Sequence, residues 1–247
     1  MSKVIIKIKQ NDISYIQYGE GKDIVLLHGW GQNIEMMKPI GDRLENYRIT
    51  IIDFPGFGAS PEPDKEWNIS DYANMVKELF KKLNIKKPIL IGHSFGGRVA
   101  IKYAANNEVE KIVLLASPCV RIKDNKREMK TKILKSIKKL PGMNKIGEYA
   151  KNFIGSRDYK AASPKMRQIL VNTVNEDLTE DAKNIKVPTL LIWGDQDEEA
   201  TIEEAHLLEK LLDDGGLVVL EGCTHYAYLE QLPRVINIIK VFLGGKQ

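Results

Sequence analysis

The sequence has little of what disulfide-stabilised, zinc-clustered or membrane-spanning proteins require. Its 247 residues include two cysteines, Cys119 and Cys223, which imply neither a disulfide framework nor a zinc cluster. No apolar run approaches the roughly 20 residues that cross a bilayer. With only four histidines, few side chains are candidates for an imidazole base.

Targeting signals are also missing. Residues 1–9 alternate like a strand and are interrupted by lysines, so nothing near the N-terminus resembles a signal peptide. The hydrophobic content of 43% is ordinary for a soluble protein. With no sign of a signal peptide, a membrane span or a disulfide framework, we expect a cytoplasmic location by default. The length suits one large α/β domain.

The most informative motif is Gly-His-Ser-Phe-Gly at residues 92–96. A short apolar run, residues 88–91, precedes it, and residues 97–105 have helical composition and periodicity. Gly-x-Ser-x-Gly between a strand and a helix predicts a nucleophile elbow, which presents the hydroxyl of Ser94 above the sheet edge. The helix N-terminus would direct backbone N–H groups at developing negative charge.

A serine nucleophile needs a base and a group that orients the base. In an elbow of this kind the carboxylate and the histidine follow the serine in that order. Two predicted strands, 188–193 and 217–220, run into Asp197 and His225, and ligands collect beyond such strand ends. We therefore predict His225 as the base and Asp197 as its partner, with Asp195 as a loop-shaping or solvated carboxylate.

The remaining candidate side chains have plainer interpretations. His206 lies in a charged helical stretch and is expected to be solvated, and His93 is expected to pack or to hydrogen-bond away from the hydroxyl. Arg98, near the start of the helix, can reach a substrate carboxylate or pair with a neighbouring loop. Cys223 is expected to fill a tight loop, and Cys119 to follow a strand and border the pocket.

The chain resembles the α/β-hydrolase fold family over nearly all of its length. Residues 28–31, His-Gly-Trp-Gly, are similar to the family's His-Gly oxyanion loop, and residues 53–60 are similar to its Asp-x-x-Gly-x-Gly-x-Ser loop. The resemblance implies that the backbone N–H groups of Trp30 and Phe95 form the oxyanion hole, and that the second loop is structural. Serine at position 94 argues against the family's dehalogenases and epoxide hydrolases, which use aspartate. No metal or organic cofactor is implied.

The predicted architecture is a mostly parallel central sheet with helices on both faces and a helical lid insertion. Residues 1–118 and 186–247 form the core, and residues 119–185, which contain no convincing strand, form the lid. The expected strands are 3–9, 12–18, 23–28, 48–52, 88–93, 111–116, 188–193 and 216–220, and the expected helices are 70–83, 95–106, 201–212 and 228–242.

Positive charge is concentrated in the predicted lid. Residues 121–167 hold 15 Lys and Arg against 4 Asp and Glu, although the whole chain carries a formal net charge of only +4. An amphipathic helix is predicted at 126–140. The basic face is either simply solvated, or a docking surface for an acidic partner such as an acyl carrier protein, or an attachment to an anionic membrane. The basic run lacks interleaved aromatics, which argues against nucleic acid.

Together these features predict a serine hydrolase, most simply a carboxylesterase of small to medium acyl esters. Two alternatives remain within enzymology: an esterase of acyl-carrier-protein-linked chains, favoured by the basic lid, and a C–C bond hydrolase or lyase of the same fold, favoured by Arg98. A third alternative is a catalytically silent receptor or scaffold, which would not need a complete triad.

Overall fold

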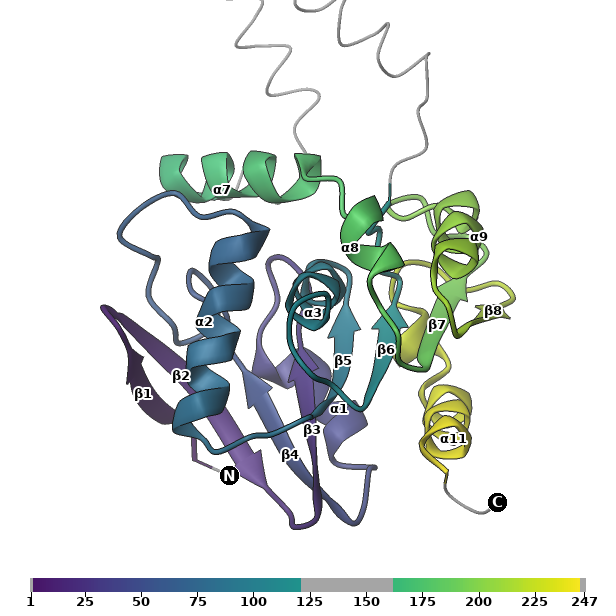
Figure 1. Cartoon of the computed structure of the whole chain (residues 1–247), viewed down its shortest axis with the longest axis horizontal. Helices are drawn as coiled ribbons and strands as arrows, with labels where there is room; N and C mark the ends of the chain where they lie inside the picture. Colours follow the sequence, from purple (N-terminus) through teal and green to yellow (C-terminus); the bar gives the residue numbers. More distant parts are fainter. Residues whose placement is uncertain (1, 121–161, 245–247) are drawn as a thin grey trace, which may run out of the picture.

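The computed structural model describes residues 2–120 and 162–244, which build one eight-stranded sheet with helices on both faces (Figure 1). The strands are β1 (Val4–Ile8), β2 (Asn11–Tyr18), β3 (Lys22–Leu27), β4 (Tyr47–Ile52), β5 (Ile89–His93), β6 (Lys111–Leu115), β7 (Thr189–Gly194) and β8 (Gly215–Leu220). The helices are α1 (Ile34–Gly41), α2 (Ile69–Lys82), α3 (Phe95–Ala104), α7 (Pro164–Asn175), α8 (Thr179–Lys183), α9 (Ile202–Leu211), α10 (Ala227–Glu230) and α11 (Leu232–Leu243).

The order of the strands brings the carboxyl ends of most of them to one edge. The order is β1-β2-β4-β3-β5-β6-β7-β8, with β1 and β2 antiparallel to their neighbours and every pair from β4 to β8 parallel. Ligand sites in open α/β sheets form where parallel strands end. The loops after β3, β5, β7 and β8 therefore meet at the edge where a site is expected.

Both faces of the sheet are buried along its central strands, β3 to β7, which explains the near-continuous apolar sequences of these strands. Along β3, Val25 and Leu27 face the core that α2 and α3 cover, whereas Ile24 and Leu26 face the core that α1 and α11 cover. A strand buried on both faces needs apolar residues at successive positions rather than in alternation. Val25 and Leu26, for example, are both fully buried although they point to opposite faces.

The predicted fold class is confirmed, with two local differences. Helix α1 was not predicted; Asn33 caps it, since its side chain accepts the Glu35 N–H, and Pro39 lies inside it, where sequence rules place a helix break. The helix predicted at 228–242 is two helices, α10 and α11. They are separated at Gln231, and Pro233 occupies the first turn of α11, where its missing N–H costs no hydrogen bond.

The described part of the predicted lid consists of helices. Figure 1 shows α7 lying across the end of α2. Two hydrogen bonds hold it there. Lys165 Nζ in α7 donates to the carbonyl of Pro63 in the loop before α2, and the N–H of Ile69 at the start of α2 donates to the side chain of Glu176, which directly follows α7. Residues 121–161, including the predicted amphipathic helix, lie outside the described residues. The lid as a separate unit therefore stays a prediction.

The described ranges contain neither a candidate membrane-spanning helix nor a candidate metal-binding cluster. Within residues 2–120 and 162–244, no helix has both the length and the apolar character needed to span a bilayer. The same part of the chain contains no group of three or more His, Cys, Asp or Glu side chains placed to hold a metal ion.

Candidate active site

Ser94 occupies the sharp turn between β5 and α3. Its φ of 48° and ψ of −111° lie in a region that a residue with a side chain rarely adopts, at a cost of about 1–3 kcal/mol. The turn is held by its backbone: the Ser94 N–H donates to the Leu115 carbonyl at 2.9 Å, and the Ser94 carbonyl accepts from Gly97 at 3.1 Å. The side chain is half-buried, so it borders both the core and the open edge of the sheet.

The glycines around Ser94 are required by close backbone contacts. A Cβ on Gly92 would lie 2.5 Å from the Gly97 backbone, and a Cβ on Gly96 would lie 2.2 Å from the Leu27 carbonyl oxygen. The Gly97 backbone cannot move without displacing α3, and the Leu27 backbone cannot move without disturbing β3. The Gly-x-Ser-x-Gly pattern thus follows from the packing of β5, α3 and the end of β3.

His225 and Asp197 form a buried hydrogen-bonded pair. Nδ1 of His225 lies 2.8 Å from Oδ2 of Asp197, and Oδ1 of Asp197 accepts the N–H groups of Glu199 and Ala200 at 2.9 Å each. A carboxylate can only accept, so Nδ1 carries the proton and Nε2 keeps its lone pair. This is the tautomer that a general base needs.

His225 lies directly beside the elbow. The ring of His93, the residue before Ser94, is 4.9 Å from the ring of His225, and Nε2 of His93 lies 3.1 Å from the His225 carbonyl oxygen. The loops after β5, β7 and β8 thus bring Ser94, Asp197 and His225 to one edge of the sheet.

The two aspartates after β7 have different surroundings. Asp197 is buried and contacts His225, whereas Asp195 is exposed and accepts the Gly222 N–H at 2.8 Å, which ties the β7 loop to the β8 loop. A buried carboxylate needs several donors, and Asp197 has two N–H groups and an imidazole. Asp195 shapes the loop, as one of the predicted alternatives stated.

Trp30 and Phe95, the predicted oxyanion donors, lie side by side. Their rings meet edge to face at 5.5 Å, and Phe95 is the first residue of α3. Within residues 2–120 and 162–244, the N–H groups of Trp30 and Phe95 donate to no backbone carbonyl in a turn, loop or helix cap. Two N–H groups close to Ser94 are suited to donate hydrogen bonds to an oxyanion.

The loop at residues 53–60 is structural, as predicted. The buried carboxylate of Asp53 accepts the N–H groups of Ile34 at 2.8 Å and Ala59 at 2.9 Å, so it fastens this loop to the start of α1. A Cβ on Gly58, whose φ is +57°, would lie 2.2 Å from Cγ of Asp53. The glycine therefore makes room for the carboxylate that organises the loop.

Arg98 contacts the chain rather than the open site. It is 5% exposed, and its guanidinium donates to the carbonyls of Pro118, Thr173 and Glu176. Thr173 and Glu176 lie at the carboxyl end of α7, where a cation also offsets the helix dipole. These contacts match the loop-pairing alternative rather than a role in binding a substrate carboxylate.

The other singled-out residues are accounted for locally. His206 is exposed on α9, and Cys223 is buried. Burial raises the pKa of the Cys119 thiol to about 12, so it is no nucleophile at neutral pH. His28 is fully buried, and burial lowers its pKa to about 4; Nδ1 donates to the Gly29 carbonyl at 2.6 Å, and Nε2 accepts the Phe54 N–H at 3.0 Å.

Two residues at the site were missed by sequence reasoning. Glu199 places a carboxylate oxygen 3.6 Å from Nε2 of His225 while its side chain is 68% exposed. Gln32 is 8% exposed and contacts both His93 and Gly29. Gln32 directly follows the His-Gly-Trp-Gly motif and Glu199 lies two residues after Asp197, so proximity to a motif was the available signal.

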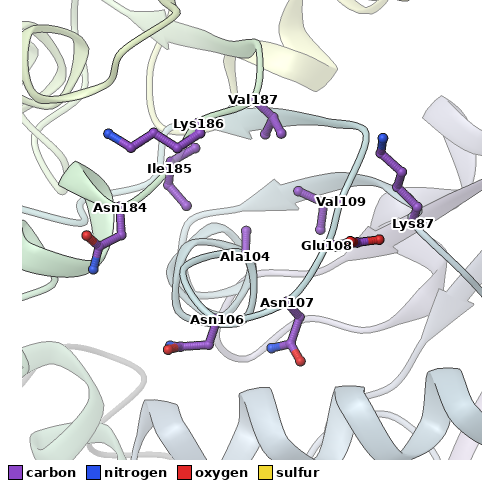
Figure 2. A pocket seen from close by; sticks show the side chains of 10 residues that line it. All are labelled: Lys87, Ala104, Asn106, Asn107, Glu108, Val109, Asn184, Ile185, Lys186 and Val187. Atoms are coloured by element: carbon purple, nitrogen blue, oxygen red, sulfur yellow. The ribbon is translucent and has the colours of Figure 1, made fainter.

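A surface depression of about 400 Å³ lies at the opposite edge of the sheet (Figure 2). Lys87, Val109 and Val187, which border it, each precede a strand: β5, β6 and β7 respectively. The depression therefore opens at the amino ends of the strands, away from Ser94 and His225. Its lining includes none of Ser94, Asp197 and His225.

The chain is similar to known proteins over nearly its whole length. The profile described as "Alpha/beta hydrolase family" matches residues 24–237. An "AB hydrolase superfamily protein YisY" from Bacillus subtilis is 26% identical, with 96% of this chain and 97% of that protein covered. A "Pimeloyl-[acyl-carrier protein] methyl ester esterase" from Aliivibrio fischeri is 25% identical, with 92% and 95% covered.

A solved structure shares the fold. The esterase EaEST from Exiguobacterium antarcticum superimposes with a TM-score of 0.77 at 22% identity, covering 99% of this chain and 100% of that one. At this identity the likeness establishes the arrangement of the chain and not the substrate.

Proposed function

This chain belongs to the alpha/beta hydrolase family and is a hydrolase, and on that premise we propose that it is a serine carboxylesterase of small to medium acyl esters. The observation that carries the proposal is the 2.8 Å hydrogen bond between His225 and Asp197, next to the strained turn at Ser94. A nucleophile, a base and a group that orients the base are the parts that acyl transfer requires.

In the proposed acylation, Oγ of Ser94 attacks the ester carbonyl carbon while its proton passes to Nε2 of His225. The carbonyl oxygen becomes an oxyanion held by the N–H groups of Trp30 and Phe95, each donor contributing about 3–4 kcal/mol to lowering the barrier. When the tetrahedral intermediate collapses, the bond to the alcohol breaks and the alcohol takes the proton from Nε2.

In the proposed deacylation, a water molecule attacks the acyl carbon and gives its proton to Nε2 of His225. The acid is then released and the proton returns to Ser94. The N–H groups of Glu199 and Ala200 donate to Asp197 and hold its carboxylate against Nδ1 of His225. The charge of Asp197 stabilises the imidazolium that forms in both halves of the cycle.

A second candidate is an esterase whose acyl chain is attached to an acyl carrier protein. The Aliivibrio fischeri relative carries such a substrate in its name, and the basic stretch 121–167 would suit an acidic carrier. The carbon–carbon hydrolase alternative relied on Arg98 as a carboxylate ligand. The three carbonyls that Arg98 contacts weaken that alternative.

Hydrolysis of a series of p-nitrophenyl esters, from acetyl to palmitoyl, tests the proposal. We expect turnover, because the proposed machinery acts on an accessible ester carbonyl, and a maximum at short or medium acyl chains, because the proposal is for an esterase of small to medium acyl esters. A methyl ester offered free and attached to an acyl carrier protein separates the two candidates. Preference for the attached form that weakens with salt would favour the carrier-linked function.

Failure of the well-folded protein on both the simple and the carrier-linked esters would overturn the esterase proposal. Turnover of a carboxylated dienone by the same preparation would then indicate carbon–carbon bond cleavage.

The carboxylate of Glu199 is expected to disfavour anionic substrates. Because it lies 3.6 Å from Nε2 of His225, an ester with its own carboxylate near the scissile bond meets a like charge there. Glu199→Gln should raise kcat/KM for the monomethyl ester of a dicarboxylic acid about two- to fivefold, as expected for one exposed charge. Values for a neutral ester of similar length should change little.

Glu198→Gln is the matched control, since Glu198 is the exposed neighbour and, within the part of the chain that the structure describes, it is Glu199 and not Glu198 that lies within ion-pair distance of Nε2 of His225. The difference should shrink in high salt, where exposed charges are screened. Equal effects on charged and neutral esters would contradict the electrostatic explanation.

A further inference from the structure

A chain of close polar contacts runs through His93 and Gln32 and spans two loops of the candidate site. Nε2 of His93 lies 3.1 Å from the backbone carbonyl oxygen of His225, and Nδ1 lies 3.1 Å from Oε1 of Gln32. The same Oε1 accepts the N–H of Gly29 at 3.0 Å, and Gly29 immediately precedes Trp30. The loop of the proposed base and the loop of a proposed oxyanion donor are thus linked through two side chains.

The ring of His93 is confined on every side that the structure describes. It is fully buried, and its centroid lies 4.7 Å from the ring of Tyr228 and 4.9 Å from that of His225. On the other side, a Cβ on Gly29 would lie only 2.7 Å from Nδ1. The position of the ring is therefore fixed by contacts, and so are the two groups it faces.

Both partners of His93 accept hydrogen bonds. A backbone carbonyl can only accept, and the Gly29 N–H fixes the orientation of the Gln32 amide, since the amide nitrogen in that place would face another donor. Burial and the nearby His225 lower the pKa of His93 to about 3, so the ring is neutral and carries one N–H. The single N–H therefore donates to one acceptor at a time, either from Nε2 to the carbonyl of His225 or from Nδ1 to Gln32, and the other contact is then kept by packing.

We propose that His93 and Gln32 are positioning residues, which set the imidazole of His225 against Ser94 and the N–H of Trp30 against the oxyanion. The inference rests on the esterase function proposed above. Neither residue touches the reacting atoms: His93 acts through the backbone of His225, and Gln32 acts through the backbone of Gly29. Misplacing reacting groups by about 1 Å can cost about a hundredfold in rate.

Three substitutions of His93 separate positioning from packing. The amide nitrogen of glutamine reaches about as far as Nε2, so His93→Gln can still donate to the His225 carbonyl. The nitrogen of asparagine reaches only as far as Nδ1, and phenylalanine keeps the ring without a donor. We expect His93→Phe and His93→Asn to lower kcat about a hundredfold with KM nearly unchanged, and His93→Gln to stay close to wild type.

Gln32 offers an independent pair of variants. Gln32→Glu keeps an acceptor for the Gly29 N–H, whereas Gln32→Met has a similar shape and no acceptor. We expect Gln32→Met to lower kcat and Gln32→Glu to restore most of it. This pair keeps the proposal testable if His93→Phe does not fold.

The readouts are kcat and KM for a p-nitrophenyl ester, the rate of covalent labelling by a fluorophosphonate, and the melting temperature. His206→Phe, an exposed histidine on α9, is the matched control and should equal wild type in all three. A role in packing alone would reverse the order, with His93→Phe active and His93→Gln impaired, and this result would overturn the inference.

Labelling also separates the two proposals. If wild type is labelled at Ser94 and His93→Phe and Gln32→Met are labelled equally fast, the positioning roles are wrong and the serine hydrolase stands. If wild type neither hydrolyses esters nor reacts with the probe, the esterase proposal fails, and the inference that rests on it fails too.

Discussion

Replacing Ser94 by alanine is expected to reduce kcat by about 10⁶-fold, which is the size of effect seen when a serine hydrolase loses its nucleophile. Without Oγ no acyl-enzyme forms, and the N–H groups of Trp30 and Phe95 are left to assist only the direct attack of water. The change removes one atom from a half-buried side chain, so the fold should be retained. Steady-state hydrolysis of p-nitrophenyl butyrate, with melting temperature as the check on folding, measures the effect.

Ser14→Ala is the matched control for that substitution. Ser14 is fully buried on β2, and its hydroxyl has no hydrogen-bond partner among the residues the structure describes, so its removal should leave turnover unchanged. Wild-type turnover by Ser94→Ala, with Ser14→Ala equally active, would show that another group performs the chemistry.

The second large effect is expected at Asp197. Asp197→Asn should lower kcat by about 10⁴-fold, as in comparable triads, because an amide can donate to Nδ1 and turn the imidazole to the wrong tautomer. Nε2 would then carry the proton and could no longer accept one from Ser94. The asparagine oxygen can still accept the Glu199 and Ala200 N–H groups, which should preserve the loop.

Asp195→Asn is a close control, since it lies two residues away and makes the same chemical change. The side-chain oxygen of asparagine can keep the hydrogen bond from the Gly222 N–H, so both the loop and kcat should be retained. If Asp195→Asn were the inactive variant and Asp197→Asn the active one, Asp195 rather than Asp197 would be the carboxylate that orients His225. The hydrolysis assay with p-nitrophenyl butyrate measures both variants.

Much of the fold was accessible from the sequence because its signals are local. The strands are short apolar runs that the sheet buries on both faces, and the elbow combines such a run with glycines that close packing requires. Helix α1 was not predicted because Pro39 interrupts its helical sequence pattern, although Asn33 at its start is a typical helix cap. The division between α10 and α11 at Gln231 was likewise hidden inside one helical pattern.

The contacts of Gln32 and His93 with other loops could not be predicted. Gln32, His93 and His225 lie far apart in the sequence, and only the strand order brings their loops to one edge. The choice between the two uses of Arg98 depended on where the end of α7 lies, which no local pattern gives. Sequence motifs name the reacting residue types, whereas the groups that hold them emerge only from the folded chain.

Covalent labelling by an organophosphate shows whether Ser94 is the nucleophile of a serine hydrolase, the role on which the whole proposed mechanism depends. The protein is incubated with diisopropyl fluorophosphate, digested, and the modified peptide identified by mass spectrometry. We predict one phosphoryl adduct, on Ser94, formed in parallel with the loss of esterase activity. Activity that persists with Ser94 unmodified, or an adduct on a different residue that tracks the loss, would contradict that role.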